Sequence, residues 1–353
     1  MKKVLLFTLS YLAVSVSVAQ SDKQLTHYMF DGMSFNPAMT GFKGYCATAI
    51  YRGQWDKVEN APNTMLVNAQ ASLPNVGVGN GGSGVGISFM NDVIGLGVER
   101  EITLNYSFHL EVPNKGHLSA GLGLGIENIG FDPKWNGPTT GWGNSALDAT
   151  LPTGASGTGL DVNFGLHWTG KDEKYYVGLS ATHLTQPTLK NVNFTKARHY
   201  YVMGGYNISN DDDFAYFLPA GMRITPSVLF KTDAVAGILD FNIMMNQWMG
   251  NGDKGFYAGL TYRHTDAFAI LLGLQMKMYT MSSKLNAGGN DSGSLAQIGR
   301  ASEPDVLKVG YSYDVMTGPL SEYGFGSHEL VLNYCMFAPA AAIHRYGNVF
   351  ILQ

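Results

Sequence analysis

The chain has 353 residues, a formal net charge of −4 and 14% charged side chains, whereas soluble proteins usually have about 25%. This balance argues against a nucleic-acid partner, because domains that bind nucleic acids carry a surplus of Lys and Arg. The chain is rich in Gly, with 44 residues, and in aromatic residues, with 19 Tyr, 18 Phe and 5 Trp. No long segment has the apolar spacing of a helix, so the composition and pattern indicate an all-β protein.

The first 19 residues have the features of a Sec signal peptide. Lys2 and Lys3 precede an apolar run over residues 4–18, which is short for a membrane anchor. We expect cleavage after Ala19, and no Cys stands at this site to carry a lipid. We interpret residues 20–44, which are polar and irregular at first, as a periplasmic lead-in to the first strand.

A turn that contains Asn36, Pro37 and Gly41 leads into the first predicted strand, residues 45–55. We expect the turn residues to have structural roles. From residue 45 onward apolar and polar side chains alternate with a period of two, which is typical of a strand with one face in an apolar medium. Thirteen further segments repeat this pattern, at residues 63–73, 83–91, 98–110, 116–129, 158–169, 175–184, 198–209, 222–231, 236–248, 255–264, 267–280, 305–316 and 327–337.

These segments predict a 14-stranded antiparallel outer-membrane β-barrel over residues 45–337. Each is about as long as a tilted strand needs to be to cross an outer membrane, and bacterial single-chain barrels have an even number of strands. A soluble β-sandwich would show the same alternation, but the export signal, low charge and high Gly content favour a barrel in contact with outer-membrane lipids.

Strand parity assigns the connections to the two sides of the membrane. With the amino terminus in the periplasm, residues 56–62, 185–197, 317–326 and the long loop 130–157 face outward. Trp135 and Trp142 lie in this long loop and are candidate partner contacts. We interpret 281–304 as an inserted flexible loop, which parity places in the periplasm, and 338–353 as a tail beyond the last strand.

Arg52 and Gln54 are predicted to face the barrel interior, next to an outward-facing Trp55. One interpretation is an interior polar network, since charges inside a barrel need partners. The other is a contact with a partner segment that enters the lumen. The same two interpretations apply to Asn91 and Asp92.

The two cysteines stand near the start of the first predicted strand and near the end of the last one. These strands become neighbours when a barrel closes, and Cys46 and Cys335 both fall on the predicted inner face. A disulfide across the seam is therefore one possibility, and two unrelated small apolar residues are the other.

Several short motifs resemble nucleotide-, zinc- or calcium-binding sequences but lack the required context or spacing. Gly77, Gly79 and Gly82 match G-x-G-x-x-G, but a strand follows instead of a helix, so we interpret them as a turn. His328 and Glu329 lack the second His of a zinc-protease motif and are expected to be structural. Residues 211–213 are three Asp without EF-hand spacing. We expect no enzyme activity, no metal and no cofactor.

Short strings along the chain resemble the PorP/SprF family of outer-membrane proteins, which is associated with the type IX secretion system of the Bacteroidota. They are QLTHYMF and FNPAMTG within residues 24–41, YRGQW at 51–55, GISFMNDVIG at 86–95, YYVGLSATHL at 175–184, RHYYVMGGY at 198–206, PSVLFK at 226–231, AILLGLQ at 269–275, GYSYD at 310–314 and GSHELVLNY at 326–334. Two features differ from the family: residues 279–304 are inserted, and the chain continues beyond Phe337.

The resemblance implies a barrel that supports the secretion or surface attachment of a cognate large protein with a carboxy-terminal sorting domain, such as an adhesin, or supports gliding. Further partners would be components of the secretion or motility machinery. The alternative is an outer-membrane transporter or porin for a hydrophobic or small polar solute.

Overall fold

The computed structural model describes residues 22–42, 44–73, 82–131, 156–189, 194–210, 212, 214–250, 252–278, 305–318, 321 and 326–336. Most of these residues lie in β-strands. In this part of the chain, no helix has the length and apolar character needed to cross a membrane. The predicted signal peptide, most of the predicted loop 130–157, the predicted insertion 281–304 and the predicted tail 338–353 lie outside the described residues.

The strands reproduce the alternating segments of the sequence closely. They are β1 (Tyr45–Gly53), β2 (Asn63–Leu73), β3 (Gly82–Ile94), β4 (Gly97–Val112), β5 (Gly116–Phe131), β6 (Ser156–Gly170), β7 (Tyr175–Thr182), β8 (Thr188–Leu189), β9 (Phe194–Thr195), β10 (His199–Tyr206), β11 (Ile208–Ser209), β12 (Met222–Thr232), β13 (Gly237–Met249), β14 (Lys254–Arg263), β15 (Ala267–Met278), β16 (Asp305–Met316) and β17 (Ser327–Met336). A short 3-10 turn, η4 (Lys171–Glu173), joins β6 to β7.

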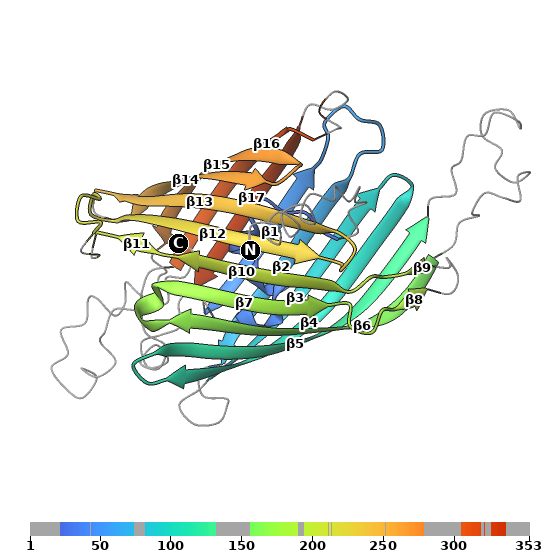
Figure 1. Cartoon of the computed structure of the whole chain (residues 1–353), viewed down its shortest axis with the longest axis horizontal. Coiled ribbons are helices and arrows are strands. Elements are labelled where there is room, and N and C mark those ends of the chain that lie inside the picture. The colour runs from blue at the N-terminus through green and yellow to red at the C-terminus, as the bar shows by residue number, and fades with distance from the viewer. Residues whose placement is uncertain are drawn as a thin grey trace, which may run out of the picture.

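One antiparallel sheet contains all of these strands except the β8–β9 hairpin, and it closes on itself. β1 pairs with both β2 and β17, and β10 pairs with both β7 and β12. Because β11 follows β10 after one residue, Asn207, and pairs with the same neighbour β12, the two count as one barrel strand. The barrel therefore has fourteen strands, as the sequence predicts. Figure 1 shows it as a cylinder of inclined strands.

We call the end of the barrel where β1 finishes the distal end, and the end where β1 starts the proximal end. The distal end carries residues 54–62, the β8–β9 hairpin and the turn 264–266, and the hairpin marks this end on the right of Figure 1. The proximal end carries the turns 113–115 and 171–174.

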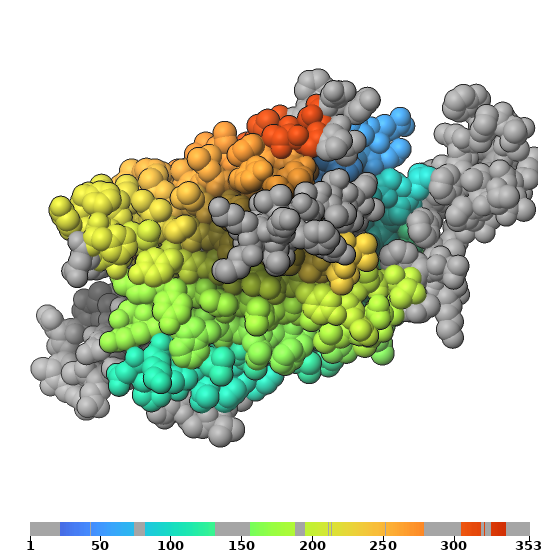
Figure 2. All heavy atoms as spheres, viewed as in Figure 1, coloured from blue at the N-terminus to red at the C-terminus, as the bar shows by residue number. Residues whose placement is uncertain are grey.

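The wall is apolar outside and polar inside. Along β4, the side chains of Ile102 and Leu104 are about half exposed, whereas those of Glu101 and Thr103, between and beside them, are buried. The same alternation recurs around the sheet, and buried polar side chains outnumber buried apolar ones. Such an inverted arrangement fits a barrel whose outer face meets lipid. In Figure 2 the green strands β6–β10 adjoin the yellow β12 and β13, so the wall is closed on that face, in agreement with the β10–β12 pairing.

Residues 22–42, which we call the plug, lie inside the barrel. We predicted a periplasmic lead-in for 20–44, and this prediction is wrong for the plug. Its short helices η1 (Tyr28–Phe30), α2 (Gly32–Phe35) and η2 (Pro37–Met39) are largely buried against inward side chains of the wall. The polar plug residues that suggested a solvated segment instead bind the polar interior of the wall.

The turn predicted at residues 36–41 holds the last part of the plug against the wall. The Asn36 side chain accepts a hydrogen bond from the amide of Ala38 at 2.9 Å and donates one to the Leu166 carbonyl at 3.0 Å. Pro37 opens η2, where its missing N–H costs nothing. Gly41 has a φ of +69°, and a Cβ there would lie 2.5 Å from the Cα of Gly84. Only glycine fits both the backbone and the space.

Candidate functional site

A buried ionic network holds the start of the plug to the barrel wall near the distal end. We call it the seam cluster, and its charged members are Arg52, Asp240, Arg263, Asp314 and Glu329, none more than 3% exposed at the side chain. Arg52 donates to Asp314 at 2.7 Å and to Glu329 at 3.3 Å. Arg263 donates to Asp240 at 3.2 Å and to Asp314 at 3.0 Å. These charge-assisted bonds link five strands: β1, β13, β14, β16 and β17.

The plug completes this cluster through its own backbone. The amides of Thr26 and His27 donate to the two carboxylate oxygens of Glu329, at 2.8 and 2.6 Å. The Thr26 hydroxyl accepts from Arg52 at 2.9 Å and lies 2.9 Å from Asp314. An interior polar network, one of the two interpretations given for Arg52, is therefore present, and Arg52 contacts a lumen segment of the same chain.

A second group of charges, which we call the acid-rich cluster, surrounds the beginning of the plug on the opposite wall. Lys196 pairs with Glu99 and, at 3.3 Å, with Glu127. The remaining members are Glu101 and Asp161 on the wall, Asp22 and Lys23 on the plug, and His183 and His199 on either side of the β8–β9 hairpin.

The electrostatics of this cluster keep Asp22 and Lys196 charged. Burial alone would raise the pKa of the Asp22 carboxyl, but Lys23 and the neighbouring His199 and His183 hold it well below its usual range. Burial would lower the pKa of Lys196, and Glu99, Glu127 and Asp22 instead raise it. A carboxylate and an ammonium group thus stay ionised in the same buried space.

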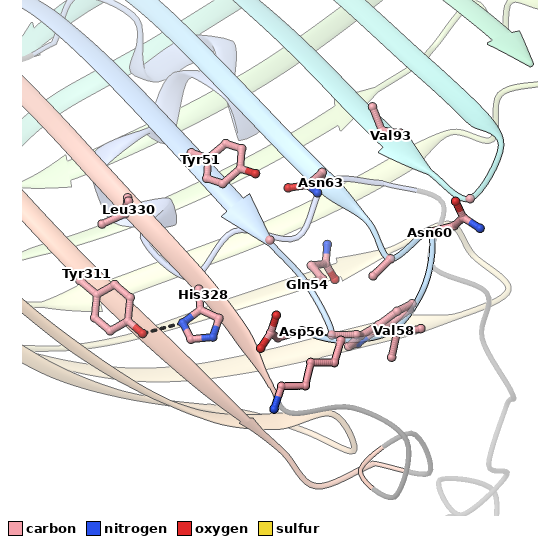
Figure 3. Close-up of a pocket in the computed structure, with 15 residues that line it drawn as sticks. Tyr51, Gln54, Asp56, Val58, Asn60, Asn63, Val93, Tyr311, His328 and Leu330 are labelled. Atoms are coloured by element: carbon pink, nitrogen blue, oxygen red, sulfur yellow. Dashed lines mark hydrogen bonds between the residues drawn. The ribbon is translucent and has the colours of Figure 1, made fainter. Parts of the chain in front are cut away.

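A pocket opens on the outer surface of the wall at the distal end, and we call it the outer pocket. Its volume is about 560 Å³, within the usual range of roughly 300–1,000 Å³ for ligand sites. Figure 3 shows Tyr311 and His328 on one side, Asn63 and Val93 on the other, and Gln54 between them. Tyr311 and His328 are joined by a hydrogen bond of 2.6 Å.

The loop 54–62 forms the rim of the outer pocket and is held by hydrogen bonds to its neighbours. The amide of Asp56 donates to the Gly326 carbonyl at 2.9 Å, and that of Gly95 donates to the Asn60 carbonyl at 3.0 Å. Trp55, Lys57 and Asn60 all have left-handed φ angles, of 50°, 67° and 57°. Non-glycine residues adopt this region at a cost, and such strained positions gather at functional sites.

A comparison with known protein families matches residues 17–334 to the family described as type IX secretion system membrane protein PorP/SprF. The match covers most of the sequence. This chain belongs to the PorP/SprF family. With its lipid-facing barrel, membership places the protein in the outer membrane, as the sequence predicts. A comparison with curated proteins gave no match.

Solved structures resemble this PorP/SprF protein in fold. The Ralstonia pickettii toluene transporter TbuX has a TM-score of 0.49 and 12% identity over 87% of this chain and 93% of its own. A Pseudomonas aeruginosa FadL homologue has a TM-score of 0.46 and 10% identity over 85% and 91%. The translocator domain of the Neisseria meningitidis autotransporter NalP has a TM-score of 0.37 and 11% identity over 87% and 94%. These similarities do not extend to what the chain binds.

The predicted site residues of the PorP/SprF protein fall into separate places. We predicted that Gln54 faces the interior, and this prediction is wrong: β1 ends at Gly53, and Gln54 lines the outer pocket together with Trp55. His328, which we expected to be structural, lines the same pocket, whereas its neighbour Glu329 is in the seam cluster. Trp135 and Trp142 lie outside the described residues.

Two further pairs are resolved by the register of the strands. Asp92 is buried and accepts a hydrogen bond from Thr64 at 2.7 Å, whereas Asn91 is half-exposed and accepts one from Arg100 at 3.2 Å. The two residues therefore do not act together. Cys46 and Cys335 are opposite each other on β1 and β17, and a disulfide joins them across the seam, which was one of the two interpretations of these cysteines.

Sequence reasoning missed the residues that gather around the plug. Thr26, His27, Asp240 and Arg263 were not singled out, and neither was Tyr311 in the outer pocket. Arg263 and Asp240 carry one readable signal, since each is a charge at an inward position of a strand whose other inward residues are uncharged.

Proposed function

We propose that this PorP/SprF protein is a non-enzymatic docking component of the outer membrane. In this proposal the outer pocket receives a segment of a cognate type IX-secreted protein, such as its carboxy-terminal sorting domain. The protein would thereby support secretion or surface attachment, for example of an adhesin used in gliding.

The observation that carries the proposal is the outer pocket itself. It is lined by Tyr51, Trp55 and Tyr311, and Trp and Tyr are enriched in the hot spots of protein interfaces. Its rim is tied to β17 and to the β3–β4 turn before any partner arrives. A preformed site loses less conformational entropy on binding than a loop that must first become ordered.

The plug inside the barrel also supports docking over diffusion of a solute through the lumen. The plug crosses the interior from the seam cluster to the proximal end, where Phe42 packs on the rings of His109, His117 and His167. Between the plug and β2–β4, a remaining cavity measures about 20 Å³, roughly enough for one water molecule. Transport through the lumen would require the plug to move.

The proposal includes an orientation. We infer from strand parity that the distal end faces outside the cell, where a secreted protein emerges. The proximal turns would then face the periplasm and the secretion or motility components.

Purification of tagged protein from detergent-solubilised outer membranes tests the proposal directly. We expect one large secreted protein to co-purify with the wild type and to be lost, by at least about tenfold, from the variants Trp55→Ala and Tyr311→Ala. Phe241→Ala is the matched control, because Phe241 is an exposed aromatic residue on β13, away from the pocket. Mass spectrometry of the bound fraction provides the measurement.

Two results would contradict docking at this site. One is equal recovery of the partner with the pocket variants and with Phe241→Ala. The other is recovery of the barrel alone together with a change in solute uptake on deletion, which would favour the transporter alternative.

A further inference from the structure

Three potential metal ligands from distant parts of the sequence meet inside the barrel. Asp22 comes from the plug, His183 follows β7 and His199 starts β10. Their donor atoms all lie within 4.8 Å of one another. The side chains of Asp22 and His183 are only 3% and 1% exposed, and His199 is 4% exposed. One carboxylate and two imidazoles form a donor set that suits first-row transition metals.

Two of these groups are buried without a hydrogen-bond partner among the described residues. Neither carboxylate oxygen of Asp22 accepts a hydrogen bond, and its nearest cation is Lys23, with Nζ at 3.9 Å. The Nε2 atom of His183 likewise has no hydrogen-bond partner. Burying an ionised carboxylate costs free energy unless a cation or hydrogen-bond donors replace the lost water. A bound cation at the Asp22 oxygens and His183 Nε2 would provide this compensation.

The surroundings of His183 are those of a metal-binding histidine. Its Nδ1 atom lies 2.9 Å from Oδ2 of the buried Asp161, which leaves Nε2 for a metal. Histidine ligands usually contact a carboxylate through the other ring nitrogen, which fixes the tautomer and raises ligand basicity. The amide of His183 also donates to Asn163 at 2.9 Å, and its φ is 56°. The backbone therefore holds the ring in place.

The charge balance of the acid-rich cluster favours an added cation. Lys196 forms ion pairs with Glu99 and Glu127, so its positive charge is mostly compensated by these two acids. Lys23 is the other lysine of the cluster. The cluster has five carboxyl groups, those of Asp22, Glu99, Glu101, Glu127 and Asp161, against these two lysines and Lys231, which also acts on Asp22 and His199.

We propose that Asp22, His183 and His199 bind a divalent transition-metal cation, with Zn²⁺ as the expected metal. The ion would tie the start of the plug to β7 and β10, opposite the seam cluster. Donors around tetrahedral zinc lie roughly 3.4 Å apart, so binding draws these three closer together. Water or a neighbouring carboxylate would supply the fourth ligand. This proposal is independent of docking at the outer pocket.

Metal titration of the purified full-length chain tests the site. The protein carries a tag without histidine, is treated with chelator in detergent and is dialysed before Zn²⁺ is added. We expect one bound equivalent by elemental analysis, and visible absorption bands when Co²⁺ replaces Zn²⁺. Asp22→Asn should weaken binding at least about tenfold, and Asp161→Asn by about 10- to 100-fold.

Controls separate this site from unspecific binding. His264→Ala should bind like the wild type, because His264 is exposed on the turn after β14 and lies outside the cluster. Asp22→Asn changes the plug and not the wall, so the variant keeps the test decisive even where His183→Ala or His199→Ala fails to fold. Absence of bound metal in the wild type would overturn the proposal, as would equal affinity in the wild type and Asp22→Asn.

Discussion

The two ionic clusters lie at the same end of the lumen and both hold the plug, but they are built differently. In the seam cluster, two arginines face three acids, and each charged side chain makes at least one hydrogen bond. In the acid-rich cluster, two lysines face five acids, and the carboxylates of Asp22 and Glu127 accept no hydrogen bond within the described part of the chain. In the seam cluster the charged side chains therefore satisfy one another and hold the plug without a further ligand. The acid-rich cluster has more acidic groups than lysines, so a bound cation would bring its net charge closer to zero.

Removal of Arg52 gives the largest expected effect. The change Arg52→Ala leaves Asp314 and Glu329 without one of their cations in a buried place, and breaking such a pair typically costs about 3–5 kcal/mol. Denaturant unfolding in detergent micelles measures the free energy of unfolding of each variant. Arg100→Ala is the control, since Arg100 is exposed, and its change should stay within about 0.5 kcal/mol. Equal values for both variants would show that the seam cluster adds no stability.

Metal loading should stabilise the chain through the acid-rich cluster alone. At a free Zn²⁺ concentration of about 100 times Kd, binding to the folded state adds about 2.7 kcal/mol, which raises Tm. A chelator should reverse the gain in the wild type and in Arg100→Ala. Asp22→Asn, with binding weakened at least about tenfold, should gain no more than about 1.4 kcal/mol at the same Zn²⁺ concentration. Differential scanning calorimetry measures the change in Tm on addition of Zn²⁺ and of chelator. A gain of the same size in Asp22→Asn would place the stabilising ion elsewhere.

The plug also contains a buried acid, Asp31, for which no ion pair is present among the described residues. Burial raises the pKa of the Asp31 carboxyl to about 7, against the opposing effects of hydrogen bonds from Ser34 and Asn68 and of the Lys23 charge. Between its ordinary pKa of 3.8 and pH 7, the folded chain holds a proton that the unfolded chain has released. Stability contributed by this group therefore falls as pH rises, by about 2 kcal/mol between pH 5 and 7.

The variant Asp31→Asn isolates this effect. It should match the wild type in stability near pH 4 and exceed it near pH 8, because an amide does not ionise. Unfolding of both proteins across this pH range provides the measurement. A constant difference at all pH values would mean that Asp31 does not titrate inside the barrel.

The strands were predictable because alternation is a local signal. Each wall position faces either lipid or the polar lumen. The polarity of neighbouring residues such as Ile102 and Thr103 therefore predicts which side of the wall each one faces. The end of β1 was not predictable in the same way. Gln54 and Trp55 continue the alternation, and the left-handed φ of Trp55, which ends the strand, leaves no mark in the residue pattern.

The plug could not be recognised from polarity, since a segment buried in a polar lumen has the composition of a solvated one. Thr26 and His27 look like loop residues, yet they are fully buried. Asp22, His183 and His199 are separated by up to 177 positions, from residue 22 to residue 199, with no metal-binding spacing. Only closure of the barrel around the plug brings them together.

The closed seam between β1 and β17 limits the routes that a bound polypeptide can take. The Cys46–Cys335 disulfide fixes its proximal half, and the Arg52–Glu329 contact fixes its distal half. These strands cannot part to form a lateral gate into the bilayer while both links hold. A partner seated in the outer pocket, which adjoins this seam, would therefore rest against a rigid wall and could not thread through it.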